Sequence, residues 1–221
     1  MYKTLTIAAA LTFSAVAANA AILDFETGFS GDSTPIVGNE FVGGFDVTFS
    51  SPNGLNIVEV GPGTDGFVPN DTPNPADAFG DYFLTSDFGQ TTSLTITYGT
   101  AVSAASFDVA DIDGSGNDLE VFTFIARDMG GNVLDTQVVD GNSPLAGDAA
   151  VTRIGFSGLA GMISEIEITG TTAGGTRFIG IAFDNFDTMV DSTAPIPLPA
   201  GAPLALLGLG ALGALRARRK S

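Results

Sequence analysis

The sequence predicts an all-β fold, an antiparallel β-sandwich of jelly-roll type. Glycine, proline, aspartate and asparagine interrupt short apolar segments at intervals of about ten residues, a spacing typical of sandwiches and barrels. Within several segments apolar and polar residues alternate with a period of two, as expected for half-buried strands. No long segment between residues 21 and 190 keeps the helical period of 3.6 residues. We therefore expect about eleven strands in two packed sheets.

Residues 1–20 have the features of a secretory signal peptide. Lys3 supplies a positive charge, residues 5–17 form a short apolar run, and Ala18 and Ala20 match a small-x-small cleavage site. A transmembrane anchor is the alternative, but the run is short and an acidic, strand-like segment follows it. We expect the β-sandwich domain to occupy residues 21–190, and a linker with a sorting motif to occupy residues 191–199.

The expected strands follow one another along the domain. Segments 45–50 and 94–98 alternate most clearly between apolar residues and polar residues. Segment 119–127 is apolar on both faces, which predicts a central strand. The longest irregular stretch, residues 61–81, contains four prolines and four aspartates. The strands that we expect are residues 22–26, 45–50, 55–60, 82–84, 94–98, 105–109, 119–127, 133–139, 151–156, 162–169 and 177–187.

The C-terminal segment, residues 200–221, predicts a single membrane-anchor helix with a basic end. Residues 200–215 carry no charge, and four cations then follow: Arg216, Arg218, Arg219 and Lys220. Sixteen helical residues reach about 24 Å, so spanning a core of about 30 Å requires thinning of the bilayer and snorkelling of the basic side chains. The positive-inside tendency places the basic end in the cytoplasm. A buried helix of a soluble domain is the alternative, but such helices do not end in four cations.

This tail resembles a known class of sorting signals. Its motif consists of Ile196, Pro197, Leu198, Pro199 and Ala200, and the apolar run and basic end follow. It is similar to the PEP-CTERM class, and to the VPLPA-CTERM variant, from which it differs by isoleucine in place of valine. The resemblance covers residues 195–221. It implies an exported protein of a Gram-negative bacterium, processed by an exosortase-type membrane protease and then released or anchored at the cell surface.

The domain also resembles, more loosely, the β-sandwich domains that often precede such tails. The recurring motifs are an early Asp-Phe-Glu strand, an Asp-x-Asp-Gly turn and a late Phe-Asp-Asn strand. Here they correspond to residues 24–26, 111–114 and 183–185. Each motif is only three or four residues long, and the resemblance implies no activity.

Composition excludes several functional classes. All 25 acidic residues lie between Asp24 and Asp191 against three arginines, so this stretch has a formal charge of −22 and repels nucleic acid. The chain contains no cysteine, which excludes disulfides, lipoprotein-type acylation and thiol chemistry. It also contains no histidine, which excludes Ser-His-Asp hydrolysis and histidine-ligated zinc.

One candidate calcium site lies on the turn after residues 105–109. Asp111, Asp113 and Ser115 match the first half of a calcium loop, in which oxygen ligands alternate along the chain. Asp118 lies nearby, but the position of the closing glutamate is occupied by Phe122, so the turn is not an EF-hand. The alternative is an ordinary solvated hairpin tip, since these residues are common in turns.

A second candidate site depends on the two ends of the domain. If the first and last strands lie side by side, Asp24 or Glu26 can face Asp184 or Asn185 and hold a cation. The alternative is that these are edge-strand side chains in water.

We interpret the chain as a non-catalytic binding or structural module at the cell surface, linked to extracellular polysaccharide or biofilm. The rival hypothesis is a carboxylate-dependent glycan hydrolase, which uses two facing carboxylates. Sugar stacking favours tryptophan and tyrosine, and the chain has no tryptophan and three tyrosines, one of them in the signal peptide. Its 17 phenylalanines are more simply explained as core residues.

Overall fold

The computed structural model describes residues 22–31, 33–61, 78–86, 91–175, 179 and 182–187, which all belong to one compact unit, Ala20–Asp191. The signal peptide, the sorting motif, the anchor helix and the basic end that the sequence predicts lie outside the described residues. Within the described ranges, no helix is both long enough and apolar enough to cross a membrane.

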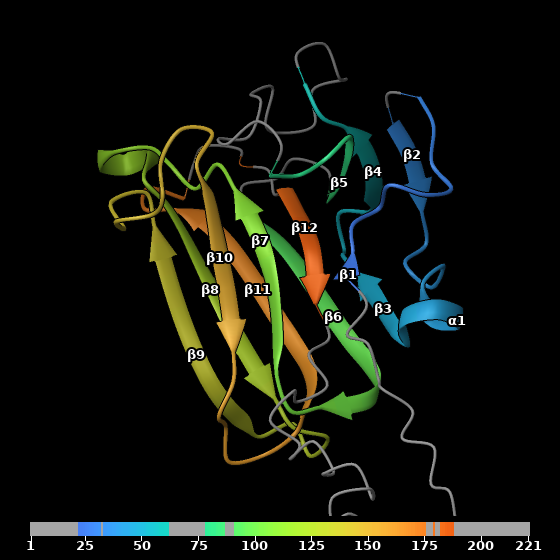
Figure 1. The fold of residues 1–221 in the computed structure, drawn as a ribbon. Helices are drawn as coiled ribbons and strands as arrows, with labels where there is room; N and C mark the ends of the chain where they lie inside the picture. Colours follow the sequence, from blue (N-terminus) through green and yellow to red (C-terminus); the bar gives the residue numbers. More distant parts are fainter. Residues whose placement is uncertain are drawn as a thin grey trace, which may run out of the picture. The chain divides into compact units, whose positions relative to one another are not determined.

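The first sheet is antiparallel throughout (Figure 1). Its strand order is β10-β7-β12-β5-β4-β2, and β1 pairs with β12 outside this path. The strands are β1 (Ile22–Leu23), β2 (Ser33–Ile36), β4 (Leu55–Glu59), β5 (Tyr82–Thr85), β7 (Ala105–Ala110), β10 (Val151–Phe156) and β12 (Ala182–Asp187).

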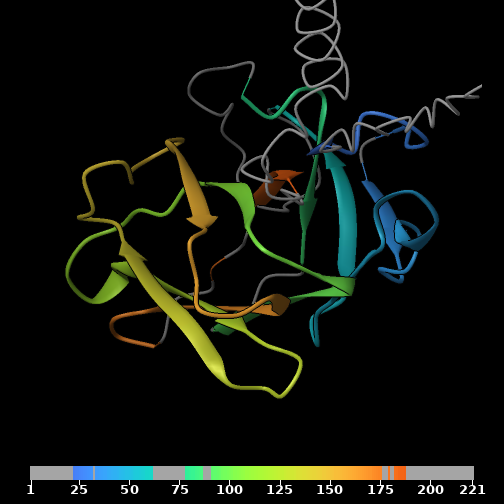
Figure 2. The same ribbon diagram turned by 60° about the horizontal axis from the view of Figure 1, so that its bottom comes forward.

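The second sheet has the order β3-β6-β11-β8-β9 and is also antiparallel. Its strands are β3 (Val47–Ser50), β6 (Thr91–Val102), β8 (Glu120–Arg127), β9 (Val133–Asp140) and β11 (Ile163–Thr172). The described chain also contains the short helix α1 (Val42–Phe45) and the 3-10 turn η1 (Gly116–Asp118). Figure 2, which turns the view of Figure 1, shows the two sheets as separate layers.

The core between the sheets is built from phenylalanine and branched aliphatic side chains. Phe107 on β7 lies 6.0 Å from Phe124 on β8 and 5.5 Å from Phe186 on β12, measured between ring centroids, so the rings join the two sheets. Nine phenylalanines are among the largest fully buried side chains. The prediction of an all-β fold with two antiparallel sheets and a phenylalanine core is therefore confirmed. The more specific jelly-roll assignment stays a prediction.

Three sequence-based expectations need correction. Phe45 belongs to α1 rather than to a strand, because the left-handed backbone of Asp46 (φ 54°) ends the helix and redirects the chain into β3. Strand β2 was not predicted: it contains Pro35, which lacks an N–H and fits an edge strand. Strand β8 pairs with both β11 and β9 but is fully buried on one face only; Val121 and Ile125 on its other face are half-buried.

Candidate functional site

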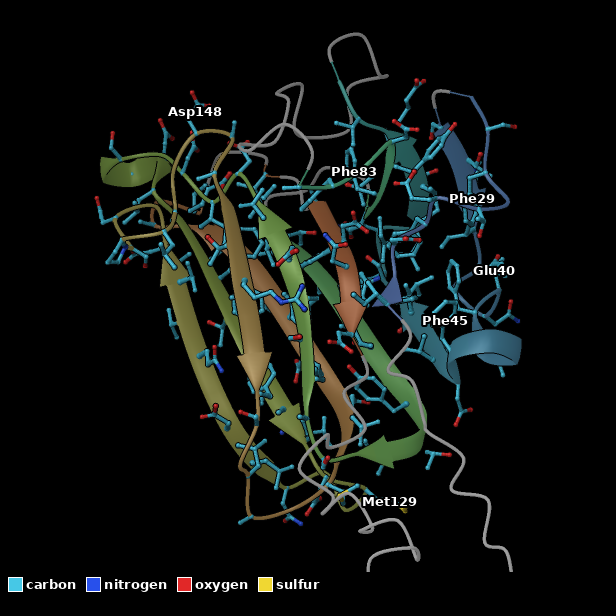
Figure 3. All side chains as sticks on the ribbon, viewed as in Figure 1. Phe29, Glu40, Phe45, Phe83, Met129 and Asp148 are labelled. Carbon is cyan, nitrogen blue, oxygen red and sulfur yellow. The ribbon has the colours of Figure 1, made fainter. Side chains whose placement is uncertain are left out.

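Three carboxylates from two loops meet at one end of the sandwich. Asp111 and Asp113 follow β7, and Asp148 comes from the loop between β9 and β10, where Figure 3 labels it. One oxygen atom from each carboxylate lies within 4.8 Å of the other two. We call this group the loop triad. Calcium takes six to eight oxygen ligands, so three carboxylates with backbone and water oxygens suit it.

Backbone hydrogen bonds hold the two loops of the triad together. The Asp111 Oδ1 atom accepts the N–H of Ala149 at 2.9 Å, and the N–H of Asp111 donates to the carbonyl of Ala150 at 3.0 Å. The N–H of Gly147 donates to the carbonyl of Ile112 at 2.9 Å. These bonds fix Asp148 opposite Asp111, although the two residues are far apart in sequence.

The buried Glu120 stabilises the same turn through two hydrogen bonds with Asp113. Its N–H donates to the carbonyl of Asp113 at 2.9 Å, and its Oε2 atom accepts the N–H of Asp113 at 3.4 Å. A β-carbon on Gly141 would lie 2.3 Å from the carbonyl oxygen of Asp113, so this position requires glycine. The backbone around Asp113 is therefore fixed by its neighbours.

The structure brings together part of the calcium loop that the sequence suggests. Asp111 and Asp113 belong to the loop triad, whereas the exposed Asp118 in η1 does not. Ser115 is exposed and precedes η1 without capping it. The sequence did not predict Asp148 as a member of this site. The residue lies in a loop that contains Gly and Asp, and no regular spacing connects it with Asp111.

The first and last strands of the domain lie side by side. Strand β1 pairs with β12 in an antiparallel register that places Ile22 opposite Asp187 and Leu23 opposite Phe186. The pairing on which the second candidate site depended is therefore present, but β1 ends at Leu23, so Asp24 and Glu26 follow the strand instead of lying within it as expected. A further acid, Asp108 on β7, lies opposite Asp184. We call Asp24, Glu26, Asp108 and Asp184 the strand cluster.

Asp184 is the buried member of the strand cluster, with 1% of its surface exposed. Burial raises the pKa of its carboxyl group to about 9; the hydrogen bond from the N–H of Asn185 opposes this rise, and the charges of Glu26, Asp24 and Asp108 add to it. That hydrogen bond, to the Asp184 Oδ1 atom, is 2.7 Å long. Asp184 therefore holds a proton at neutral pH when no cation is bound.

The other members of the strand cluster have defined partners. The Oε1 atom of Glu26 accepts the N–H groups of Asp81 at 2.8 Å and Tyr82 at 3.2 Å. The Nδ2 atom of Asn185 donates to Asp108 Oδ2 at 3.0 Å, and Arg153 forms a 3.1 Å ion pair with Asp108 Oδ1. Among the described residues, only the carboxylates of the loop triad lie within 4.8 Å of one another as a group of three, so the carboxylates of the strand cluster are more widely spaced.

A third feature is a shallow groove on the outer face of the second sheet, with a volume of about 260 Å³. None of the described residues that line it is charged. In the sheet register Thr169 lies opposite both Ser93 and Thr123, so hydroxyl groups form rows across neighbouring strands about 4.8 Å apart. The groove, which we call the hydroxyl groove, is lined by Thr91, Thr92, Ser93, Val121, Thr123, Thr169, Gly170 and Thr171.

The chain matches no family model and no curated protein. It is similar to solved structures at low identity. TmCBM61 in complex with β-1,4-galactotriose has 15% identity and a TM-score of 0.36, over 72% of this chain and 99% of that one. The K2 cleaved adhesin domain of Lys-gingipain has 11% identity and a TM-score of 0.43, over 77% and 98%. The MgGH51 α-L-arabinofuranosidase has 14% identity and a TM-score of 0.42, over 76% and 26%.

Proposed function

We propose that this chain is an exported, non-catalytic glycan-binding module that acts at the cell surface, with extracellular polysaccharide as its partner. The observation that carries the proposal is the hydroxyl groove. Hydroxyl groups both donate and accept hydrogen bonds, as sugar hydroxyls do. A groove without charge in a strongly acidic domain suits a neutral glycan, since an anionic one would be repelled.

The rival hypothesis, a carboxylate-dependent glycan hydrolase, is less well supported. A glycosidase needs two carboxyl groups that flank the scissile bond, roughly 5–10 Å apart. The described lining of the hydroxyl groove contains no carboxylate, and the space between the sheets is filled by phenylalanine side chains. Measured hydrolysis of a bound neutral oligosaccharide, abolished by a single carboxylate substitution, would restore the hydrolase.

The double variant Thr123→Val/Thr169→Val tests the groove. Each lost hydrogen bond is worth about 0.5–1.5 kcal/mol, so the affinity for a neutral oligosaccharide should fall about tenfold. We would select the ligand on an array of neutral and anionic glycans and measure its Kd by calorimetry. Thr97→Val, on the same face of β6 but outside the groove, is the matched control and should bind normally. Unchanged affinity of the double variant would rule out the groove as the site.

We further propose that calcium binds the loop triad and stabilises the turn. Weak extracellular sites have Kd values of roughly 10⁻⁴–10⁻³ M, so millimolar calcium that binds only the folded state adds about 0.4–1.4 kcal/mol. Asp113→Asn should remove the calcium-dependent rise in melting temperature. Asp118→Asn, which removes the same charge on the same turn outside the triad, should keep it. If magnesium at equal ionic strength gives the same rise, charge screening rather than a calcium site is the cause.

We propose a second cation site at the strand cluster, with ligands from three of its members, Asp24, Glu26 and Asp184, and from the side-chain oxygen of the neighbouring Asn185. The buried Asp184 accepts a hydrogen bond from the N–H of Asn185 and lies among three other carboxylates. A divalent cation offsets the repulsion among them.

We propose that the tail is a removable address read by an exosortase-type membrane protease, and that the apolar helix anchors the chain in the inner membrane until cleavage. Mass spectrometry of the protein released from the cell surface should then find no peptide beyond about Ala200. Recovery of a peptide that contains Arg216 to Lys220 from that fraction would contradict the proposal. Alanine at Pro197 and Pro199 should cause the uncleaved form to accumulate in the membrane.

A further inference from the structure

A pocket of about 390 Å³ lies between the end of β1 and α1, away from the hydroxyl groove. Ligand pockets typically have volumes of about 300–1,000 Å³. Two short segments, residues 23–29 and 40–45, supply its described walls. Figure 3 labels three of the lining residues, Phe29, Glu40 and Phe45, on the same flank of the domain. Four of its wall residues are phenylalanines, so we call it the phenylalanine pocket.

The phenylalanine rings differ in burial. Phe25 and Phe41 are buried and meet edge to face, with centroids 5.3 Å apart. Phe29, whose ring lies 6.2 Å from that of Phe41, and Phe45 are only half-buried. The buried pair belongs to the core, and the half-buried pair lines the pocket with part of its surface exposed. An aromatic face attracts cations and also the apolar C–H face of a sugar ring.

Two carboxylates, Asp24 and Glu40, lie at the same pocket, and none of its described lining residues is basic. Glu40 is held in place, because its Oε1 atom accepts the N–H of Val37 at 2.9 Å and its Oε2 atom accepts the N–H of Gly38 at 2.7 Å. Both described arginines are occupied elsewhere: Arg127 pairs with Glu167 and Arg153 with Asp108. The pocket therefore combines aromatic surface with negative charge.

We propose that the phenylalanine pocket binds a protonated amine carried on a sugar ring, that is, a hexosamine unit whose amino group is not acetylated. The ammonium group would lie between the carboxylates and the aromatic faces. The ring hydroxyls would hydrogen-bond to the hydroxyl of Thr27 and to the backbone at Gly28 and Gly44. There is open space beside both glycines, because a β-carbon placed on either one would meet nothing within 4 Å outside its own segment. This site is separate from the hydroxyl groove and stands or falls independently of it.

The test is a calorimetric titration of the purified protein at about pH 5, where the amino groups of the sugar are protonated and exposed carboxylates stay ionised. We expect an oligomer of glucosamine to bind at least tenfold more tightly than the matching oligomer of N-acetylglucosamine or of glucose. Tetramethylammonium should bind more weakly than the glucosamine oligomer. Equal binding of the charged and acetylated oligomers would overturn the proposal, and tighter binding of tetramethylammonium would overturn the assignment to a sugar.

Variants locate the binding. Glu40→Gln should weaken binding of the glucosamine oligomer at least tenfold, whereas Glu59→Gln, an exposed acid on β4 outside the pocket, should not. Because Glu40 also holds the backbone of residues 37 and 38, Phe29→Leu provides a second, independent variant with the same expected loss. Equal effects of Glu40→Gln and Glu59→Gln, with no effect of Phe29→Leu, would show non-specific attraction to an acidic protein. Thr123→Val/Thr169→Val should leave this binding unchanged, which separates it from the groove.

Discussion

Phe124→Ala is expected to lower the free energy of unfolding by about 3–5 kcal/mol, the usual cost of truncating a fully buried phenylalanine. The Phe124 side chain has 0% of its surface exposed and its ring lies 6.0 Å from that of Phe107 in the opposite sheet, so the cavity would open between the two layers. Denaturation in urea, monitored by circular dichroism, gives the change in midpoint and slope.

The matched control is Val138→Ala on the neighbouring strand β9. Its side chain is 59% exposed, so the substitution should change the free energy of unfolding by less than about 0.5 kcal/mol. A cost of less than about 1 kcal/mol for Phe124→Ala would mean that the interface between the sheets is not packed around this ring. A spectrum dominated by helix would contradict the fold itself.

Asp184→Asn is expected to stabilise the metal-free domain at about pH 8 by up to about 6 kcal/mol. The pKa of Asp184 rises from 3.8 to about 9 in the folded protein. Between these values the unfolded chain releases the proton while the folded domain keeps it, so the stability of the wild type falls as the pH rises through this window. One pKa unit corresponds to about 1.36 kcal/mol. Asparagine does not titrate, so the variant should lose this slope.

Calcium should narrow the difference in stability between the wild type and Asp184→Asn. If the strand cluster binds the ion, Asp184 loses its proton on binding, and calcium stabilises the wild type more at high pH than at low pH. Asp184→Asn should keep less than half of that calcium-dependent gain. Thermal melts with chelator and with calcium, at about pH 5 and pH 8, measure both effects, and Asp118→Asn serves as the charge-matched control. A variant that is less stable than the wild type in chelator at pH 8 would refute the raised pKa.

Local patterns in the sequence predicted much of the core. Phe122 and Phe124 alternate with half-buried residues along β8, and Leu94 and Ile96 do so along β6, as the period of two indicated. These positions can be read from sequence because each strand sends successive side chains to opposite faces whatever its partners are. Strand β2 could not be read in this way, because only its pairing with β4 makes it a strand.

The candidate sites were predictable only in part. Asp111 and Asp113 are two residues apart, so their proximity follows from the turn alone. The pairing of β1 with β12 was a conditional expectation, and the structure meets the condition. The hydroxyl groove was not predicted from the sequence. Its three-strand surface required the register of β6, β11 and β8.

By itself the sequence determined the all-β class, the strands whose periodicity is strong and the acidic, cysteine-free and histidine-free chemistry that excludes whole families of mechanism. Only the tertiary structure decided which polar side chains share a site. Loop hydrogen bonds bring Asp148 close to Asp111, and the pairing of β12 with β7 places Asp108 opposite Asp184. The members of each pair come from segments far apart in the chain. The hydrophobic period and the composition of a segment predict its secondary structure and which of its faces is buried. The burial that raises the pKa of Asp184 comes instead from distant segments that pack around it.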